Sequence, residues 1–277
     1  MTTRALVLGG GGITGIAWEW GVLAGLAEAG IALGDADLVV GTSAGSVVGA
    51  QVANGLDPSV RYKAQLEPPD GEVAAALGAG VMLRFALAMV GSRAPQRVRQ
   101  RIGRLSQRTG TSATEQERIA VIESRLPVKD WPASPRLAIT AVDTETGGFR
   151  VFDQESGVPL VLAVAASCAV PGVWPPVTID GRRYMDGGVR SGVNADLAAG
   201  YDKVVVLAPI PRGFGPMAGA AEQVRELGGQ VVLVTPSAEA LKAFGRNMLD
   251  PAARAAAARA GLAQAPSLVE SVRAAWT

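Results

Sequence analysis

The most informative segment of this sequence is Asp37-Leu38-Val39-Val40-Gly41-Thr42-Ser43-Ala44-Gly45. Residues 37–40 form a short, mostly apolar run that predicts a buried strand, and the apolar residues 44–52 predict a helix. Between them lies the pattern G-x-S-x-G, whose two glycines allow the tight turn that exposes a serine oxygen at the carboxyl end of a strand. The stretch predicts a nucleophile elbow with Ser43 at its tip. The plainer alternative is a loop in which Ser43 only caps the helix.

Further short apolar runs of the same kind alternate with longer helical stretches, and they lie at residues 5–8, 136–140, 203–207 and 230–234. Continuous rather than alternating hydrophobicity indicates strands that are covered on both faces, which is typical of a parallel sheet with helices on either side. We therefore expect an α/β protein, a three-layer α/β/α fold with a mainly parallel central sheet. The 277 residues fit a single domain over residues 1–277.

A hairpin is predicted near the middle of the chain. Residues 177–179 and 182–185 read as two strands, and Asp180-Gly181 is typical of the type I′ turn that joins them. Asp186-Gly187-Gly188 follows the second strand. A carboxylate at that strand end can project toward the centre of the sheet, which makes Asp186 a candidate functional residue.

The glycine-rich segment Gly9-Gly10-Gly11-Gly12-Ile13-Thr14-Gly15 lies between the first predicted strand and a helix that is expected to begin near Gly15 and to run to Glu28. Successive glycines let backbone N–H groups converge, and the helix N-terminus adds positive potential, so the loop suits an anion. The anion is either a phosphate or a transient oxyanion. Gly10, Gly12 and Gly15 also satisfy G-x-G-x-x-G, with Asp35 and Asp37 about 20 residues on, which leaves a dinucleotide-binding oxidoreductase open as an alternative.

The chain has no histidine, and this excludes a Ser-His-Asp triad, a Cys-His pair and imidazole metal ligands. A carboxylate, lysine, tyrosine or water must carry any proton transfer. The one cysteine, Cys168, cannot form an internal disulfide or hold zinc alone, so no metal or other cofactor is expected. A net charge of +1 gives no reason to expect nucleic acid. These features, and an N-terminus without a signal-peptide pattern, predict a cytoplasmic protein.

Residues 67–125 contain no clear strand and are expected to form a helical insertion. Within it one helix face carries four arginines at helical spacing, Arg97, Arg101, Arg104 and Arg108. Together with the apolar residues 73–90, this face predicts peripheral contact with an anionic membrane. The alternative is an ordinary solvated helix face. Neither residues 73–90 nor residues 156–179 are expected to span a membrane, since prolines or charge interrupt both.

Four segments together resemble the blocks of the patatin-like phospholipase family, and they occur in the family's order. They are residues 8–15, residues 41–45, the segment Ala166-Ser167-Cys168-Ala169-Val170-Pro171-Gly172-Val173-Trp174-Pro175-Pro176, and residues 186–188. The third segment is the most specific. The resemblance covers residues 4–210 and implies a patatin-like fold and a serine lipid acyl hydrolase with a Ser-Asp dyad, which agrees with the absence of histidine.

The resemblance implies that Ser43 is the nucleophile, that Asp186 is its dyad partner and that the N–H groups of Gly10, Gly11 and Gly12 form the oxyanion hole. The activity would be of the phospholipase A, lysophospholipase or carboxylesterase type, acting on a lipid or other acyl ester. Thr14 departs from the family, which commonly has Arg or Lys there. Two alternatives stay open, an acyltransferase that uses the same acyl-enzyme and a non-catalytic lipid-binding protein.

Overall fold

The computed structural model describes residues 2–68, 75, 79–90, 92, 94–111, 113–213 and 215–277. In this part of the chain eight strands form one mixed sheet, in the order β5-β6-β3-β2-β1-β7-β8, with β4 paired to β3. The strands β3, β2, β1, β7 and β8 are parallel, and β4, β5 and β6 run antiparallel to their neighbours. Their bounds are Arg4–Leu8 (β1), Leu38–Gly41 (β2), Arg136–Asp143 (β3), Phe149–Phe152 (β4), Val177–Ile179 (β5), Arg182–Asp186 (β6), Lys203–Leu207 (β7) and Gln230–Val234 (β8).

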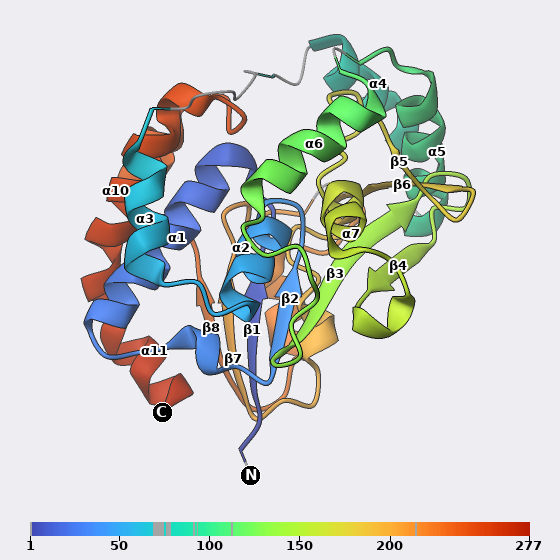
Figure 1. Cartoon of the computed structure of the whole chain (residues 1–277). Coiled ribbons are helices and arrows are strands. Elements are labelled where there is room, and N and C mark those ends of the chain that lie inside the picture. The colour runs from blue at the N-terminus through green and yellow to red at the C-terminus, as the bar shows by residue number, and fades with distance from the viewer. Residues whose placement is uncertain are drawn as a thin grey trace.

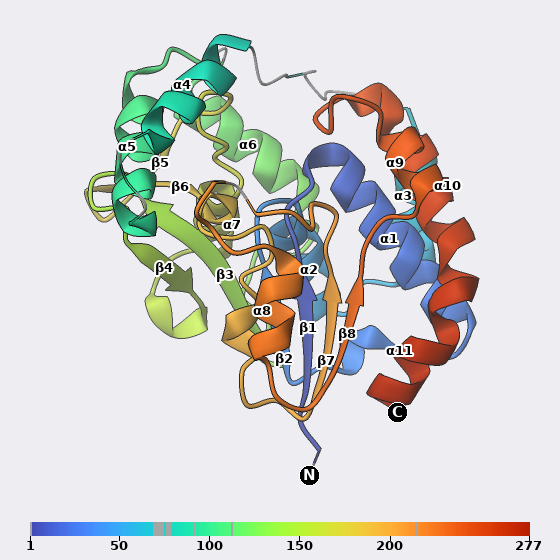
Figure 2. The same cartoon turned by 180° about the vertical axis from the view of Figure 1, so that it is seen from behind.

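Helices flank the sheet on both faces (Figures 1 and 2). Their bounds are Gly12–Glu28 (α1), Ala44–Ala53 (α2), Pro58–Leu66 (α3), Ala79–Met89 (α4), Pro95–Arg108 (α5), Glu115–Arg125 (α6), Leu160–Ser167 (α7), Ala220–Glu226 (α8), Ala238–Phe244 (α9), Arg254–Gln264 (α10) and Val269–Trp276 (α11). The larger core lies between the sheet and α1, α2, α7, α10 and α11. On the other face a smaller apolar cluster packs against α8, and a third packs against α5. The expected α/β fold with flanking helical layers is confirmed.

Successive side chains of a strand point to opposite faces of the sheet, so one strand can contribute to both apolar cores. Leu6 and Leu8 of β1 point into the larger core, whereas Ala5 and Val7 point into the smaller one. All four side chains are buried, as the continuous apolar run predicts. The strand predictions at residues 203–207 and 230–234 match the observed bounds, and those at residues 5–8, 37–40 and 136–140 are confirmed within three residues.

The hairpin of β5 and β6 also forms as predicted. Asp180 and Gly181 have φ angles of 50° and 74°, and positive φ at both central positions is the mark of a type I′ turn. No residue pattern indicated β4, whose four residues pair antiparallel with β3. The helix expected to begin near Gly15 begins three residues earlier, at Gly12.

The described residues between 67 and 125 form the helices α4, α5 and α6, as expected of a helical insertion. Figure 1 shows that α4 and α6 lie beyond the carboxyl ends of the parallel strands. On α5, Val98 and Ile102 face the third apolar cluster, and Arg97, Arg104 and Arg108 are exposed. Arg101 instead donates to the carbonyl oxygens of Ala88 and Val90, at 3.3 and 2.7 Å, beside the C-terminus of α4. The predicted apolar residues 73, 74 and 76–78 lie outside the described residues.

Among the residues that the structure describes, no helix is both long enough and apolar enough to cross a bilayer. The apolar segment at residues 156–179 contributes α7, a buried helix of eight residues that packs against β3, β5 and β6.

Candidate active site

Ser43 lies in a strained turn between β2 and α2. Its backbone has a φ of 52° and a ψ of −119°, a region that non-glycine residues rarely adopt and that costs about 1–3 kcal/mol. Gly45 makes the turn possible, because a Cβ atom there would lie 2.1 Å from the carbonyl oxygen of Leu8. The turn brings α2 directly against the end of β1. It is the geometry of a nucleophile elbow, and Ser43 makes no side-chain cap to α2.

Three side chains hold the backbone of Ser43 in this conformation. The hydroxyl oxygen of Ser167 accepts the Ser43 N–H at 2.9 Å. The carbonyl oxygen of Ser43 accepts from the hydroxyl of Ser46 at 2.6 Å and from the thiol of Cys168 at 3.2 Å. Burial raises the pKa of Cys168 to about 11, so the thiol stays protonated at neutral pH and can donate this hydrogen bond. Sequence reasoning had assigned no role to Ser167 or Ser46.

Asp186 reaches Ser43 from the last residue of β6. This strand pairs antiparallel with β3, in a register that sets Asp186 opposite Ala141. The hydroxyl of Ser43 donates to Oδ2 of Asp186 at 2.6 Å, and the N–H of Gly188 donates to Oδ1 at 2.7 Å. The serine and the aspartate are 8% and 5% exposed, and a water-poor setting strengthens the contact between them.

Burial raises the pKa of Asp186 to about 6, although the hydrogen bonds from Ser43 and Gly188 act in the opposite direction. Desolvation disfavours the charged carboxylate more than these two donors stabilise it. A carboxylate with this pKa is a better proton acceptor than an ordinary aspartate, yet it is still mostly ionised at pH 7. Beside the dyad, Val170 lines both cavities next to Ser43, and Trp174 lines one of them.

The buried side-chain amide of Asn194 forms hydrogen bonds to several chain segments beneath the elbow. The side-chain amide of Asn194 donates to the hydroxyls of Thr42 and Thr140 at 3.0 and 3.3 Å, and to the carbonyl oxygen of Gly187 at 3.3 Å. Thr42 precedes Ser43 on the elbow, and Gly187 follows Asp186. One side chain is therefore hydrogen-bonded to both segments that carry the candidate dyad.

The glycine loop passes beside Ser43, and Gly10, Gly11 and Gly12 line the same cavity as Ser43 and Asp186. The N–H of Gly10 is already donated to the carbonyl oxygen of Gly192 at 2.7 Å. Within the described part of the chain, the N–H groups of Gly11 and Gly12 have no such acceptor, and Gly12 begins α1 with a φ of 59°. The loop therefore offers an anion two N–H groups at a helix N-terminus, one fewer than the three expected.

The two aspartates considered for a dinucleotide ribose lie far from this loop. Asp37 precedes β2, where its carboxylate accepts the backbone N–H of Arg4 at 2.7 Å, and Asp35 precedes it in a short 3₁₀ helix. Both are at the amino ends of the strands, whereas the glycine loop follows the carboxyl end of β1. This placement does not provide the ribose carboxylate that the dinucleotide alternative needs.

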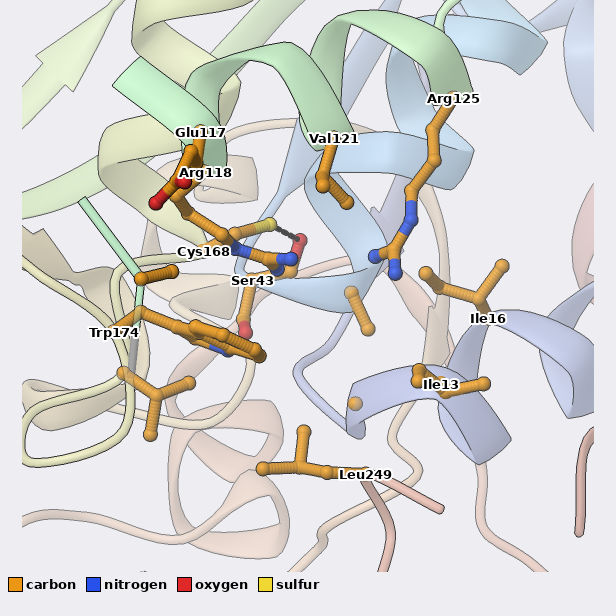
Figure 3. Close-up of a pocket in the computed structure, with 14 residues that line it drawn as sticks. Ile13, Ile16, Ser43, Glu117, Arg118, Val121, Arg125, Cys168, Trp174 and Leu249 are labelled. Atoms are coloured by element: carbon orange, nitrogen blue, oxygen red, sulfur yellow. Dashed lines mark hydrogen bonds between the residues drawn. The ribbon is translucent and has the colours of Figure 1, made fainter. Parts of the chain in front are cut away.

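Ser43 opens into two cavities. One, of about 320 Å³, extends under α6 and is lined by Ile13, Ile16, Val121, Trp174 and Leu249 together with Arg118 and Arg125 (Figure 3). The other, of about 490 Å³, extends past the glycine loop toward α4 and α5 and is lined by Phe85, Ile102, Val189 and Ile210 among others. An ester carbonyl at Ser43 can extend one substituent into each cavity.

Thr14, which stands where a basic residue is usual in the family, lines neither cavity. It is fully buried, and its N–H donates to the carbonyl oxygen of Met248 at 3.2 Å. The positive charge in the site comes instead from α6, an element that sequence reasoning treated only as part of the insertion. In the described residues no group of three or more cysteine, aspartate or glutamate side chains could hold a metal ion.

The model of the patatin-like phospholipase family matches residues 6–199, well over half of the chain. The chain therefore belongs to the patatin-like phospholipase family. At the level of that family it is an ester hydrolase that acts on lipids. No curated protein gave a significant match.

Several solved structures are similar to the chain, including the following three. VipD from Legionella pneumophila has a TM-score of 0.48 and 14% identity, over 98% of this chain and 67% of VipD. The type III effector protein ExoU has a TM-score of 0.43 and 16% identity, over 97% of this chain and 53% of ExoU. Full-length ExoU in complex with SpcU from Pseudomonas aeruginosa has a TM-score of 0.40 and 15% identity, over 100% of this chain and 53% of that one. The chain thus spans about half the length of ExoU.

Proposed function

We propose that the protein is a serine lipid acyl hydrolase in which Ser43 is the nucleophile and Asp186 the general base. The observation that carries this proposal is the 2.6 Å hydrogen bond from the Ser43 hydroxyl to Asp186, formed where burial raises the carboxyl pKa to about 6. A serine hydroxyl needs a base to remove its proton as it attacks, and no imidazole exists in this chain to do so.

In the proposed reaction the Ser43 oxygen attacks the carbonyl carbon of an ester, and its proton passes to Oδ2 of Asp186. The negative charge that develops on the carbonyl oxygen is stabilised by the N–H groups of Gly11 and Gly12 and by the N-terminus of α1. Each well-placed donor of this kind is worth about 3–4 kcal/mol in a measured protease case. The tetrahedral intermediate collapses, the alkoxide leaves with the proton from Asp186, and an acyl-serine remains.

Deacylation repeats these steps with water as the nucleophile. Asp186 accepts a proton from the water as it attacks the acyl-serine, and then returns a proton to the Ser43 oxygen as the ester bond breaks. An alcohol in place of water would give acyl transfer. Product analysis with added glycerol separates the two reactions, because only transfer yields an acylglycerol.

The proposal is tested with a short p-nitrophenyl ester and a fluorophosphonate probe. We expect Ser43→Ala and Asp186→Asn each to lower turnover at least a thousandfold, and the probe to label wild-type protein but not Ser43→Ala. Ser267→Ala, at an exposed serine far from the site, is the matched control and keeps both signals. Near-normal turnover by a folded Ser43→Ala protein would overturn the assignment, and so would labelling that persists in it.

We also propose that the insertion contacts anionic lipid. Leu83, Leu87 and Val90 are 62%, 60% and 67% exposed and share one face of α4 and its end. The neighbouring α5 exposes Arg97, Arg104 and Arg108, whereas Arg101 is held against the end of α4. Apolar side chains beside cations are the combination that binds a lipid surface. A cytoplasmic location remains a prediction.

A further inference from the structure

The two cavities beside Ser43 meet at a small set of residues. In the described part of the chain four residues line both cavities, Gly12, Ser43, Val170 and Leu249. Val170 and Leu249 are the apolar side chains among them. Figure 3 shows Leu249 on the side of the smaller cavity opposite α6, with its side chain directed toward Ser43. An apolar side chain therefore stands at the boundary between the 320 Å³ and the 490 Å³ cavity.

Leu249 belongs to a turn at residues 247–250, between α9 and α10. The N–H of Asp250 donates to the carbonyl oxygen of Asn247 at 3.1 Å, and the N–H of Leu249 donates to Oδ1 of Asn247 at 3.1 Å. The turn lies outside residues 6–199, which the family model matches. Its position in the site is therefore a feature of this chain that the family match does not account for.

Hydrogen bonds to two other segments hold the turn in place. The carbonyl oxygen of Met248 accepts the backbone N–H of Thr14 at 3.2 Å and the Thr14 hydroxyl at 3.4 Å. The side-chain amide of Asn247 donates to the carbonyl oxygen of Ala75 at 2.8 Å. The turn is thus bonded to α1 on one side and to the insertion on the other, so the backbone that carries Leu249 is constrained from both sides.

The turn also packs closely on the glycine loop. A Cβ atom on Gly12 would lie 2.6 Å from the carbonyl oxygen of Met248 and 2.9 Å from Cδ2 of Leu249. Close packing of this kind sets the Leu249 side chain against the loop that borders Ser43. Any shift of the turn away from the loop would have to break the hydrogen bonds that hold it.

Each cavity offers apolar lining to a hydrocarbon chain. The smaller one has Ile13 and Ile16 beneath α6, and the larger one has Phe85 and Ile102 toward α4 and α5. A methylene group buried against such lining strengthens binding about fourfold. Methylene groups that reach past the end of one cavity meet Leu249 or water, and they add nothing to binding.

We infer that Leu249 is a specificity-determining residue, whose side chain separates the two cavities and limits the length of acyl chain that the site binds. The inference rests on the proposed function and deepens it, because it names esters of short and medium acyl chains as the preferred substrates. A chain that fits within one cavity is buried along its whole length. A longer chain gains nothing, since Leu249 closes the way into the second cavity.

The test measures kcat/KM for p-nitrophenyl butyrate, octanoate and dodecanoate, each below its micellar concentration. For the wild type we expect kcat/KM to rise from butyrate to octanoate and to level off at dodecanoate. Leu249→Ala joins the cavities, so the ratio of dodecanoate to octanoate should rise at least tenfold, at about fourfold per additional buried methylene. Leu249→Trp fills space on both sides of the boundary and should lower the ratio of octanoate to butyrate at least tenfold.

Leu241→Ala is the matched control, because it makes the same substitution at a leucine of α9 that is 53% exposed and lines neither cavity. We expect it to leave both ratios unchanged. Wild-type ratios in Leu249→Ala and Leu249→Trp would overturn the inference. An equal loss for all three esters would overturn it as well, since Leu249 would then support the fold of the site and not its selectivity.

A binding measurement separates this inference from the proposed function. If none of the esters is hydrolysed in a way that depends on Ser43, the proposed function fails, and calorimetry with octanoate and dodecanoate still tests the role of Leu249. In Ser43→Ala we expect the two fatty acids to bind with affinities within about threefold of each other. With Leu249→Ala added, dodecanoate should bind at least tenfold more tightly than octanoate, and similar affinities in that double variant would contradict the inference.

Discussion

Ser167 accepts the backbone N–H of Ser43 at 2.9 Å, although 124 positions separate the two residues in the chain. The bond links the end of α7 to the elbow between β2 and α2. Two residues further on, the carbonyl oxygen of Ala169 accepts the backbone N–H of Asp186 at 3.0 Å. The end of α7 and the turn after it therefore position both members of the candidate dyad.

Removal of the Ser167 hydroxyl is expected to act on turnover more than on substrate binding. In Ser167→Ala the buried Ser43 N–H has no acceptor, which costs about 1–3 kcal/mol of stability, and the strained φ loses a constraint. We expect kcat for a p-nitrophenyl ester to fall about 10- to 100-fold with little change in KM. An unchanged kcat in a protein destabilised by this amount would show that the bond is only structural.

The pH dependence of kcat/KM is expected to report the ionisation of Asp186. Only the carboxylate can accept the Ser43 proton, so kcat/KM rises about tenfold per pH unit below the pKa of about 6 and levels off above it. No imidazole can produce this limb, because the chain has no histidine. A rate that does not vary between pH 5 and pH 8 would contradict the assignment of Asp186 as the base.

The raised pKa of Asp186 also predicts that Asp186→Asn stabilises the protein more at high pH than at low pH. The pKa of Asp186 is about 6 in the folded state, against about 3.9 when unfolded. The contribution of this carboxyl group to the free energy of unfolding is therefore largest below pH 4, where the group is protonated in both states. It decreases as the pH rises to 6, by at most about 3 kcal/mol. The asparagine variant escapes this loss.

Urea unfolding of Asp186→Asn and wild type at pH 4.5 and pH 7.5 checks this prediction. The difference in unfolding free energy should increase with pH, whereas the exposed control Asp130→Asn should show no comparable increase. If the difference in unfolding free energy is the same at both pH values, folding does not raise the pKa of Asp186.

Gly45→Ala is expected to destabilise the fold severely. The new methyl group would lie 2.1 Å from the carbonyl oxygen of Leu8, against the backbone of the inner strand β1. Overpacking against backbone costs about 1–3 kcal/mol or more. Gly228→Ala meets no atom within 4 Å and serves as the control in a thermal melt. Equal melting temperatures for the two variants would refute the close packing of the elbow on β1.

Binding to vesicles with 30% anionic lipid is expected to depend on α5. The triple variant Arg97→Gln, Arg104→Gln and Arg108→Gln should sediment with vesicles at least tenfold more weakly, at about 1 kcal/mol per arginine. A control triple variant, Arg225→Gln, Lys242→Gln and Arg259→Gln, removes the same charge from exposed positions elsewhere. If both triple variants lose binding equally, net charge rather than this surface attracts the protein.

The sequence predicted best those features that depend on short residue patterns. The elbow, the type I′ turn and the continuous strands follow from residue patterns over fewer than ten positions, and the fold class and family predicted from them are confirmed. The catalytic roles of Ser43, Asp186 and the glycines remain predictions. The engagement of the Gly10 N–H by Gly192 was not foreseeable, because it depends on a loop 182 positions away.

Long-range packing explains the other omissions. The arginine pattern of α5 was visible, but nothing local indicated that Arg101 would bond to the end of α4. Similarly, Arg118 and Arg125 are ordinary residues of a polar helix until the fold sets α6 over Ser43. β4 was missed because four residues with partly exposed side chains carry little periodic signal.

The pairing of β6 with β3 has a consequence during protein synthesis. Ser43 and Asp186 are 143 residues apart, and ribosomes add about 5–20 residues per second, so the elbow segment emerges roughly 7–30 s before Asp186. A nascent chain during that interval carries the serine without a proton acceptor. In the proposed mechanism hydrolysis begins only after β6 has joined the sheet, so the first release of acyl product would mark the completion of folding.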